Sequence, residues 1–224
     1  MLYIHGYGQS SADVTDDQAL VEAVTGSGAV LIVPDGLDRR WSFAGSPSQG
    51  ARDEIAFLRA VLDDAERRWP IDEARVIAAG FSIGGSVVWD LACHAGEGFA
   101  AFLPVSGDFW LPYPESCESG PVNLRHIHGM NDQTVPMGGR PLRGGRFTQG
   151  DIGKSLAILQ QTDRCGAEAD HIEQQGELKC WIWSSCASGK RLELCLHGDG
   201  HMMNAQWLRD GIAWAFRLPA ASGG

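Results

Sequence analysis

The chain has 224 residues, of which 44% are hydrophobic and 21% charged, and its formal net charge is −10 at pH 7. This length and hydrophobic content suit one sizeable core, so we expect a single domain over residues 1–219 and a disordered tail at 220–224. The acidic balance disfavours nucleic acid and anionic membranes as partners, and no apolar run approaches the length of a membrane span. The oligomeric state stays open at this point.

Short apolar runs alternate with helical patterns along the chain. The expected strands are residues 2–4, 29–34, 75–81, 102–107 and 125–129, followed by a hairpin of 180–184 and 191–198. The expected helices begin near Thr15 and then span 50–68, 86–95, 152–163 and 204–216. Residues 108–123 and the basic stretch 138–146 are expected to be loops. Short buried strands between helices predict an α/β fold with a mostly parallel sheet and helices on both faces.

Residues 80–84 read Gly-Phe-Ser-Ile-Gly, which is the pattern G-x-S-x-G. In hydrolases this pattern places a nucleophilic serine on a sharp turn between a strand and a helix, and the flanking glycines permit that turn. The pattern alone is weak, and a structural serine in a glycine-rich turn is the alternative. Because an expected strand precedes the motif and an expected helix follows it, we expect Ser82 to be a nucleophile.

Such a serine requires an acid and a histidine, in the chain order Ser, Asp, His. Asp132 follows the expected strand at 125–129, and His201 follows the expected strand at 191–198. Catalytic groups gather at the carboxyl ends of parallel strands. We therefore expect His201 to take the proton of Ser82 and Asp132 to orient the imidazole.

Two other acids compete for the role of Asp132. Asp199 lies two residues from His201, too near in the chain to reach the ring easily from the required side. Asp108 also follows a strand, but one strand earlier than expected for the acid. Both are weaker candidates than Asp132.

The remaining histidines do not indicate a metal site. His197 and His201 have H-x3-H spacing, but the glycines between them argue against the helix that a metal pair would need. His126 and His128 alternate on an expected strand and are expected in the core or behind the site. We expect neither a metal nor another cofactor.

An oxyanion hole is expected from two backbone N–H groups. One belongs to Ile83, the residue after the nucleophile, at the start of the following helix. The other is assigned to Tyr7, in the loop after the first strand, where Gly6 and Gly8 allow the chain to fold tightly beside Ser82.

The chain as a whole resembles one branch of the α/β-hydrolases. The resemblance is carried, in order, by HGYGQSSADV, PDGLDRRW, ARDEIAFLRAVLD, IDEARVIAAGFSIGGSVVWDLAC, HGMNDQTVP and the ending WIWSSC…HGDGH. These segments are similar to polyhydroxybutyrate depolymerase-like and feruloyl esterase-like enzymes. The resemblance implies an α/β-hydrolase fold, secretion or a periplasmic location, and the roles already given to Ser82, Asp132, His201, Tyr7 and Ile83.

The resemblance implies a carboxylic ester hydrolase with an acyl-enzyme intermediate, acting on hydroxyalkanoate, feruloyl or acetyl esters, either small or polymeric. A peptidase or thioesterase is the alternative, because a triad does not reveal its leaving group, and a non-catalytic binding module is a third possibility. Trp41 and Trp110 are expected to line the substrate cleft, with core packing as the alternative for each. A cytoplasmic location is the alternative to secretion.

The start of the chain departs from this branch, whose members usually carry about two strands before the His-Gly loop. Here Met1 leads directly into the strand at 2–4. We therefore expect the first strands of the sheet to be missing and the strand at 2–4 to lie near an exposed edge. Such an edge would promote dimerisation or aggregation.

The six cysteines are an even number, which suits disulfides, although six buried thiols are the alternative. Counting outward from the loop of the expected hairpin places Cys180 opposite Cys195. Cys186 is then free to reach Cys165, a pairing that the resemblance also suggests. Cys93 and Cys117 remain, on either side of the strand at 102–107. The expected bridges are Cys165–Cys186, Cys93–Cys117 and Cys180–Cys195.

Overall fold

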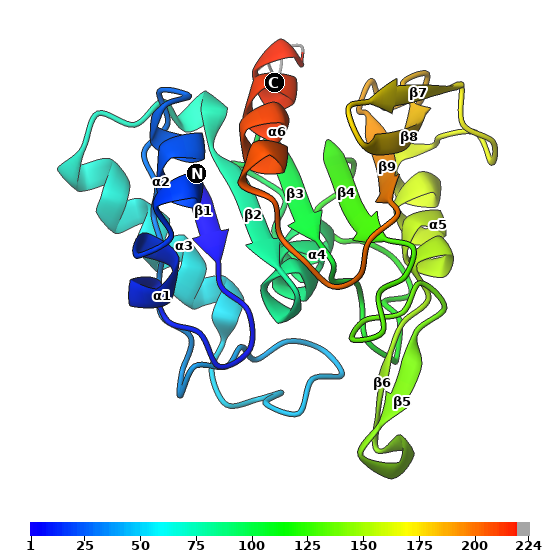
Figure 1. The fold of residues 1–224 in the computed structure, drawn as a ribbon, viewed down its shortest axis with the longest axis horizontal. Helices are drawn as coiled ribbons and strands as arrows, with labels where there is room; N and C mark the ends of the chain where they lie inside the picture. Colours follow the sequence, from blue (N-terminus) through cyan, green and yellow to red (C-terminus); the bar gives the residue numbers. More distant parts are fainter. Residues whose placement is uncertain (219–224) are drawn as a thin grey trace.

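The computed structural model describes residues 1–218, which form a seven-stranded sheet with helices on both faces (Figure 1). In sheet order the strands are β1 (Leu2–Ile4), β2 (Ile77–Phe81), β3 (Ala101–Val105), β4 (Leu124–Gly129), β9 (Leu192–His197), β8 (Leu178–Trp183) and β7 (His171–Gln175). Strands β1 to β4 and β9 are parallel, whereas β8 is antiparallel to both of its neighbours. The expected mostly parallel sheet is confirmed. The tail expected at 220–224 lies outside the described residues.

Each face of the sheet carries its own apolar core. One core lies under α1 (Ser11–Thr15), α2 (Gln18–Thr25) and α6 (Ala205–Arg217), and the other under α3 (Glu54–Arg68), α4 (Ile83–His94) and α5 (Ile152–Asp163). In β1, Leu2 and Ile4 join the α3–α5 core and Tyr3 joins the other, because side chains alternate along a strand. Within residues 1–218, no helix combines the length and the apolar composition needed to cross a membrane.

Side-chain caps explain where four of the helices begin. A capping side chain accepts a hydrogen bond from a backbone N–H of the first turn, which has no partner inside the helix. The caps of α2, α3, α5 and α6 are Asp17, Asp53, Asp151 and Asn204. The helix expected at 50–68 therefore begins only at Glu54, whereas α5 has the expected bounds.

The strand expected at 29–34 is not a full strand, and this changes the edge of the sheet. Only Ile32 pairs with β1: its carbonyl accepts from Tyr3 N at 2.8 Å, and its N–H donates to Met1 O at 2.9 Å. The amino group of Met1 also donates to Val30 O at 2.7 Å. The expectation that the strand at 2–4 has an exposed edge was wrong, because this segment covers it. The argument for aggregation through β1 therefore does not hold.

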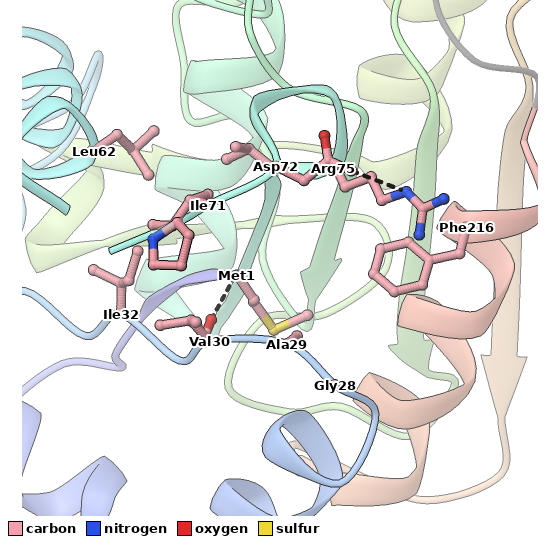
Figure 2. Close-up of a pocket in the computed structure, with 12 residues that line it drawn as sticks. Met1, Gly28, Ala29, Val30, Ile32, Leu62, Ile71, Asp72, Arg75 and Phe216 are labelled. Carbon is pink, nitrogen blue, oxygen red and sulfur yellow. Dashed lines mark hydrogen bonds and ion pairs between the residues drawn. The ribbon is translucent and has the colours of Figure 1, made fainter. Parts of the chain in front are cut away.

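A cavity of about 220 Å³ lies beside this segment (Figure 2). Met1, Val30, Ile71, Arg75 and Phe216 are among its lining residues. It lies at the amino ends of β1 and β2, whereas Ser82 follows the carboxyl end of β2. The cavity is thus separate from the expected nucleophile.

Two polar regions contain strands that the sequence did not predict. The stretch 138–146, expected as a loop, belongs to a hairpin of β5 (Arg140–Leu142) and β6 (Phe147–Gln149), which Figure 1 shows projecting away from the main sheet. Its turn contains Gly144 and Gly145, both with positive φ. Strand β7 is largely exposed and polar. Neither region has the apolar pattern on which strand prediction depends.

Three disulfides are present, and two of them link elements that the sheet does not join directly. They pair Cys93 with Cys117, Cys165 with Cys186 and Cys180 with Cys195, the pairs proposed from the sequence. The first ties α4 to the loop after β3, and the second ties the end of α5 to the turn after β8. The third joins register partners on β8 and β9. Three bridges fit folding in an oxidising environment.

Removing the Cys165–Cys186 bridge by a double substitution to serine is expected to lower the free energy of unfolding by about 3 kcal/mol. The two cysteines are 21 residues apart, and without the bridge the unfolded chain gains the entropy of that loop. Urea unfolding followed by tryptophan fluorescence would measure the change. Wild-type protein in dithiothreitol serves as the control and should lose at least as much stability. An unchanged midpoint in the double variant would contradict the expectation.

Candidate active site

Ser82 sits on a strained turn between β2 and α4. Its backbone has φ 57° and ψ −123°, a combination that residues other than glycine rarely adopt. Close packing around the turn excludes side chains: a Cβ on Gly84 would overlap Ile4 O, and one on Gly107 would overlap Ser82 O. These glycines allow β1 and β3 to approach the turn and hold the strained serine in place.

The structure brings Ser82, His201 and Asp132 into one hydrogen-bonded chain. His201 Nε2 lies 2.9 Å from Ser82 Oγ, and His201 Nδ1 lies 2.7 Å from Asp132 Oδ2. Because the carboxylate only accepts, Nδ1 carries the proton and Nε2 is free to accept from the serine hydroxyl. The ring of Phe81 packs on the imidazole, with 4.8 Å between ring centroids.

The carboxylate of Asp132 is held from both sides. Its Oδ1 accepts hydrogen bonds from the backbone N–H groups of Thr134 and Val135, each at 2.8 Å. The residue is only 2% exposed, so these bonds replace the water that a charged carboxylate would otherwise bind. The turn at 132–135 therefore fixes the direction in which Oδ2 faces His201.

A buried pair of histidines supports this turn from behind. The indole N–H of Trp89 donates to His126 Nδ1 at 3.3 Å, and His126 Nε2 lies 3.0 Å from His128 Nδ1. His128 Nε2 then donates to Val135 O at 2.7 Å. Since an indole only donates and a carbonyl only accepts, both rings are neutral with the proton on Nε2. Burial lowers the pKa of both histidines, which agrees with the neutral forms.

The loop of His201 is attached to the loop of Asp132. Asn131 donates from its side chain to Gly198 O at 2.6 Å and from its backbone N to Asp199 O at 3.1 Å. A side chain on Gly129 would collide with the carbonyl of Gly200. The two loops therefore stabilise each other, which keeps the imidazole of His201 within hydrogen-bond distance of Asp132.

The rival acids are placed differently. The carboxylate of Asp199 is largely exposed and faces His197, 4.0 Å from its Nδ1, rather than His201. Asp108 is fully buried, and its two carboxylate oxygens have no hydrogen-bond partner within residues 1–218. Burial and nearby Asp151 raise the pKa of Asp108 well above its usual range.

Tyr7 and Ile83, the expected oxyanion donors, line the same cavity as Ser82. Within the described part of the chain, the backbone N–H of neither residue donates a hydrogen bond. The Tyr7 loop is held by His5, whose Nε2 accepts from Gly36 N at 3.0 Å. The oxyanion role of these two N–H groups stays a prediction.

The expectation that Trp41 lines the cleft was wrong. Trp41 is fully buried, and its indole N–H donates to His5 O at 2.9 Å, so its polar atom is satisfied inside the core. This bond supports the start of the Tyr7 loop from the core side. Trp110, in contrast, does line the cavity beside Ser82.

The cavity has a volume of about 310 Å³ and lies at the carboxyl ends of the parallel strands. Its walls come from four loops, from the nucleophile turn with the start of α4, and from the β5–β6 hairpin. The lining residues not foreseen from the sequence are Arg40, Pro47, Ser48, Ser86, Thr134, Val135, Arg140, Leu142, Arg143 and Gln149. The basic stretch 138–146 was the one signal that pointed to part of this set.

Several esterases are similar in sequence to this chain. It is 28% identical to feruloyl esterase D of Neurospora crassa over 180 residues, which cover 79% of this chain and 55% of that protein. It is 30% identical to the putative esterase NocK of Nocardia uniformis subsp. tsuyamanensis over 141 residues, 62% of this chain and 41% of that protein. The chain thus spans about half the length of these relatives. No protein-family model matches it.

Among solved structures, the acetyl xylan esterase from Aspergillus awamori superposes with a TM-score of 0.68 over 96% of this chain and 87% of that one, at 12% identity. Together with the nucleophile turn and the sheet order, this likeness establishes the α/β-hydrolase fold. In sequence the chain is similar to feruloyl esterases, the branch that its motifs indicated. The likeness to polyhydroxybutyrate depolymerases stays a prediction.

Proposed function

We propose that this protein hydrolyses carboxylic esters through an acyl-enzyme on Ser82. The observation that carries the proposal is the continuous hydrogen-bonded chain from Ser82 Oγ through His201 to Asp132, at 2.9 and 2.7 Å. A cavity large enough for a small ester opens directly onto this serine. The similarity to named esterases supports the same reaction class.

In each half of the reaction, His201 takes up one proton and then gives it away. Ser82 Oγ attacks the ester carbonyl carbon while His201 Nε2 takes the hydroxyl proton, and the N–H groups of Tyr7 and Ile83 hold the oxyanion. His201 then gives that proton to the departing alcohol, which leaves an acyl group on Ser82. In the second half, His201 takes a proton from water while the water oxygen attacks the acyl carbon. His201 then returns this proton to Ser82 Oγ as the carboxylic acid leaves. Asp132 stabilises the imidazolium in both halves.

The substrate is assigned by similarity and by the shape of the cavity. Relatives named as feruloyl esterases and a fold neighbour named as an acetyl xylan esterase favour feruloyl or acetyl esters, with hydroxyalkanoate esters as a further member of the class. Trp110 and Leu142 supply an apolar wall for such groups. The three disulfides support a secreted or periplasmic protein.

Hydrolysis of 4-nitrophenyl esters of increasing acyl length, beside methyl ferulate and hydroxybutyrate oligomers, tests this proposal. We expect turnover of at least one ester class and covalent labelling of Ser82 by a fluorophosphonate probe. Heat-denatured protein should neither turn over ester nor be labelled. Folded protein that hydrolyses none of these esters and takes up no probe would contradict the proposal.

A further inference from the structure

Three arginines line the cavity beside Ser82, in a protein whose net charge is −10. They are Arg40, from the loop after the Ile32 bridge, and Arg140 and Arg143, from the β5–β6 hairpin. No aspartate or glutamate is among the residues that line this cavity. The charged side chains that line the cavity are therefore all basic, although the net charge of the molecule is negative.

The structure leaves the charge of these arginines unneutralised. Within residues 1–218, the ion pairs of the protein involve other basic groups, and none of the three has a carboxylate oxygen within ion-pair distance. Three like charges around one cavity repel one another, so their placement costs free energy unless an anion binds there.

Arg140 is also positioned by a buried partner. Its Nε donates to Gln149 Oε1 at 3.1 Å, and Gln149 is only 5% exposed. This bond fixes the guanidinium plane through Nε and leaves its two terminal nitrogens available for a ligand. The guanidinium of Arg40 lies 5.7 Å from the ring centre of Tyr7, so a second cation lies next to the residue proposed for the oxyanion hole.

We propose that the ester substrate carries a carboxylate, which binds at Arg140 with Arg40 and Arg143 around it. A guanidinium presents parallel N–H donors that match the two oxygens of a carboxylate. Trp110 and Leu142 then contact the apolar part of the same substrate. This inference rests on the proposed ester hydrolysis and narrows it to anionic esters, with the carboxylate on either the acyl or the alcohol part.

Matched pairs of esters test the charge preference on each part. Mono-4-nitrophenyl glutarate and 4-nitrophenyl pentanoate have acyl chains of equal length, and only the first is charged. On the alcohol part, 4-acetoxybenzoate is compared with its methyl ester. Each kcat/KM is divided by the rate constant for hydrolysis of the same ester by hydroxide, which removes differences in the intrinsic reactivity of the esters. We expect the charged member of at least one pair to be preferred about tenfold or more, as charged hydrogen bonds predict.

An Arg140→Gln substitution should then reduce that preference ratio by about tenfold, and high salt should reduce it in the wild type. The matched control is Arg146→Gln, because Arg146 belongs to the same hairpin but does not line the cavity, and its ratio should equal that of the wild type. Equal or better hydrolysis of the neutral member in both pairs would overturn the inference alone, as would an unchanged ratio in Arg140→Gln. No hydrolysis of any ester, with Ser82 unlabelled by fluorophosphonate, would overturn the proposed function as well.

Discussion

Replacing Ser82 with alanine is expected to lower kcat for ester hydrolysis by about a million-fold, the loss seen when a triad nucleophile is removed. No other hydroxyl among the described residues lies within hydrogen-bond distance of His201 Nε2. The fold should persist, because alanine keeps the Cβ already accommodated at this strained position. Hydrolysis rates, with circular dichroism to check folding, measure the effect.

Labelling by a fluorophosphonate probe gives the control for this variant. Ser86 lies one helical turn after Ser82 and lines the same cavity, but its Oγ accepts a hydrogen bond from Asp108 N and does not contact His201. Ser86→Ala should therefore still be labelled, whereas Ser82→Ala should not. Labelling of the Ser82 variant, or hydrolysis at the wild-type rate, would refute the assignment.

The second large effect is expected at Asp132. Asp132→Asn should lower kcat about ten-thousand-fold, because an amide facing His201 Nδ1 favours the wrong imidazole tautomer and cannot stabilise the imidazolium. The bonds that Thr134 and Val135 donate to Oδ1 can be kept by the asparagine oxygen, which turns the amide nitrogen toward His201.

Asp199→Asn is the matched control, since it makes the same chemical change beside the same histidine loop. The Asp199 carboxylate is largely exposed and faces His197, so this variant should lose far less activity than Asp132→Asn. A larger loss in Asp199→Asn would identify Asp199 as the acid and contradict the structure-based assignment.

The sequence predicted those elements best that have clear apolar patterns and end signals. Residues 2–4 form β1 and residues 152–163 form α5, as expected, the latter because Asp151 caps it. The apolar run at 29–34 was predicted as a strand but makes only a single bridge, through Ile32. An apolar composition does not show whether an extended segment pairs along its whole length or at one residue. The polar β7 and the arginine-rich hairpin lacked the pattern altogether.

The candidate triad was predictable because each member follows a strand, so the order of the strands alone brings the three together. Apart from Trp110, most of the walls of the cavity were not, because residues such as Arg40, Thr134 and Arg140 come from segments far apart in the sequence. Trp41 was predicted in the cleft but lies in the core. The sequence did not show this, because the bond from its indole N–H to His5 O depends on how the two segments pack.

The β5–β6 hairpin has a consequence for how substrate choice can change. It pairs with no strand of the main sheet, and two backbone hydrogen bonds, Leu111 N to Thr148 O and Gly150 N to Phe109 O, join its second strand to the loop after β3. We therefore expect that changes in the length or charge of the hairpin turn, residues 143–146, leave these two bonds and the nucleophile turn intact. We expect selection for activity on new esters, in nature or in the laboratory, to change this hairpin first.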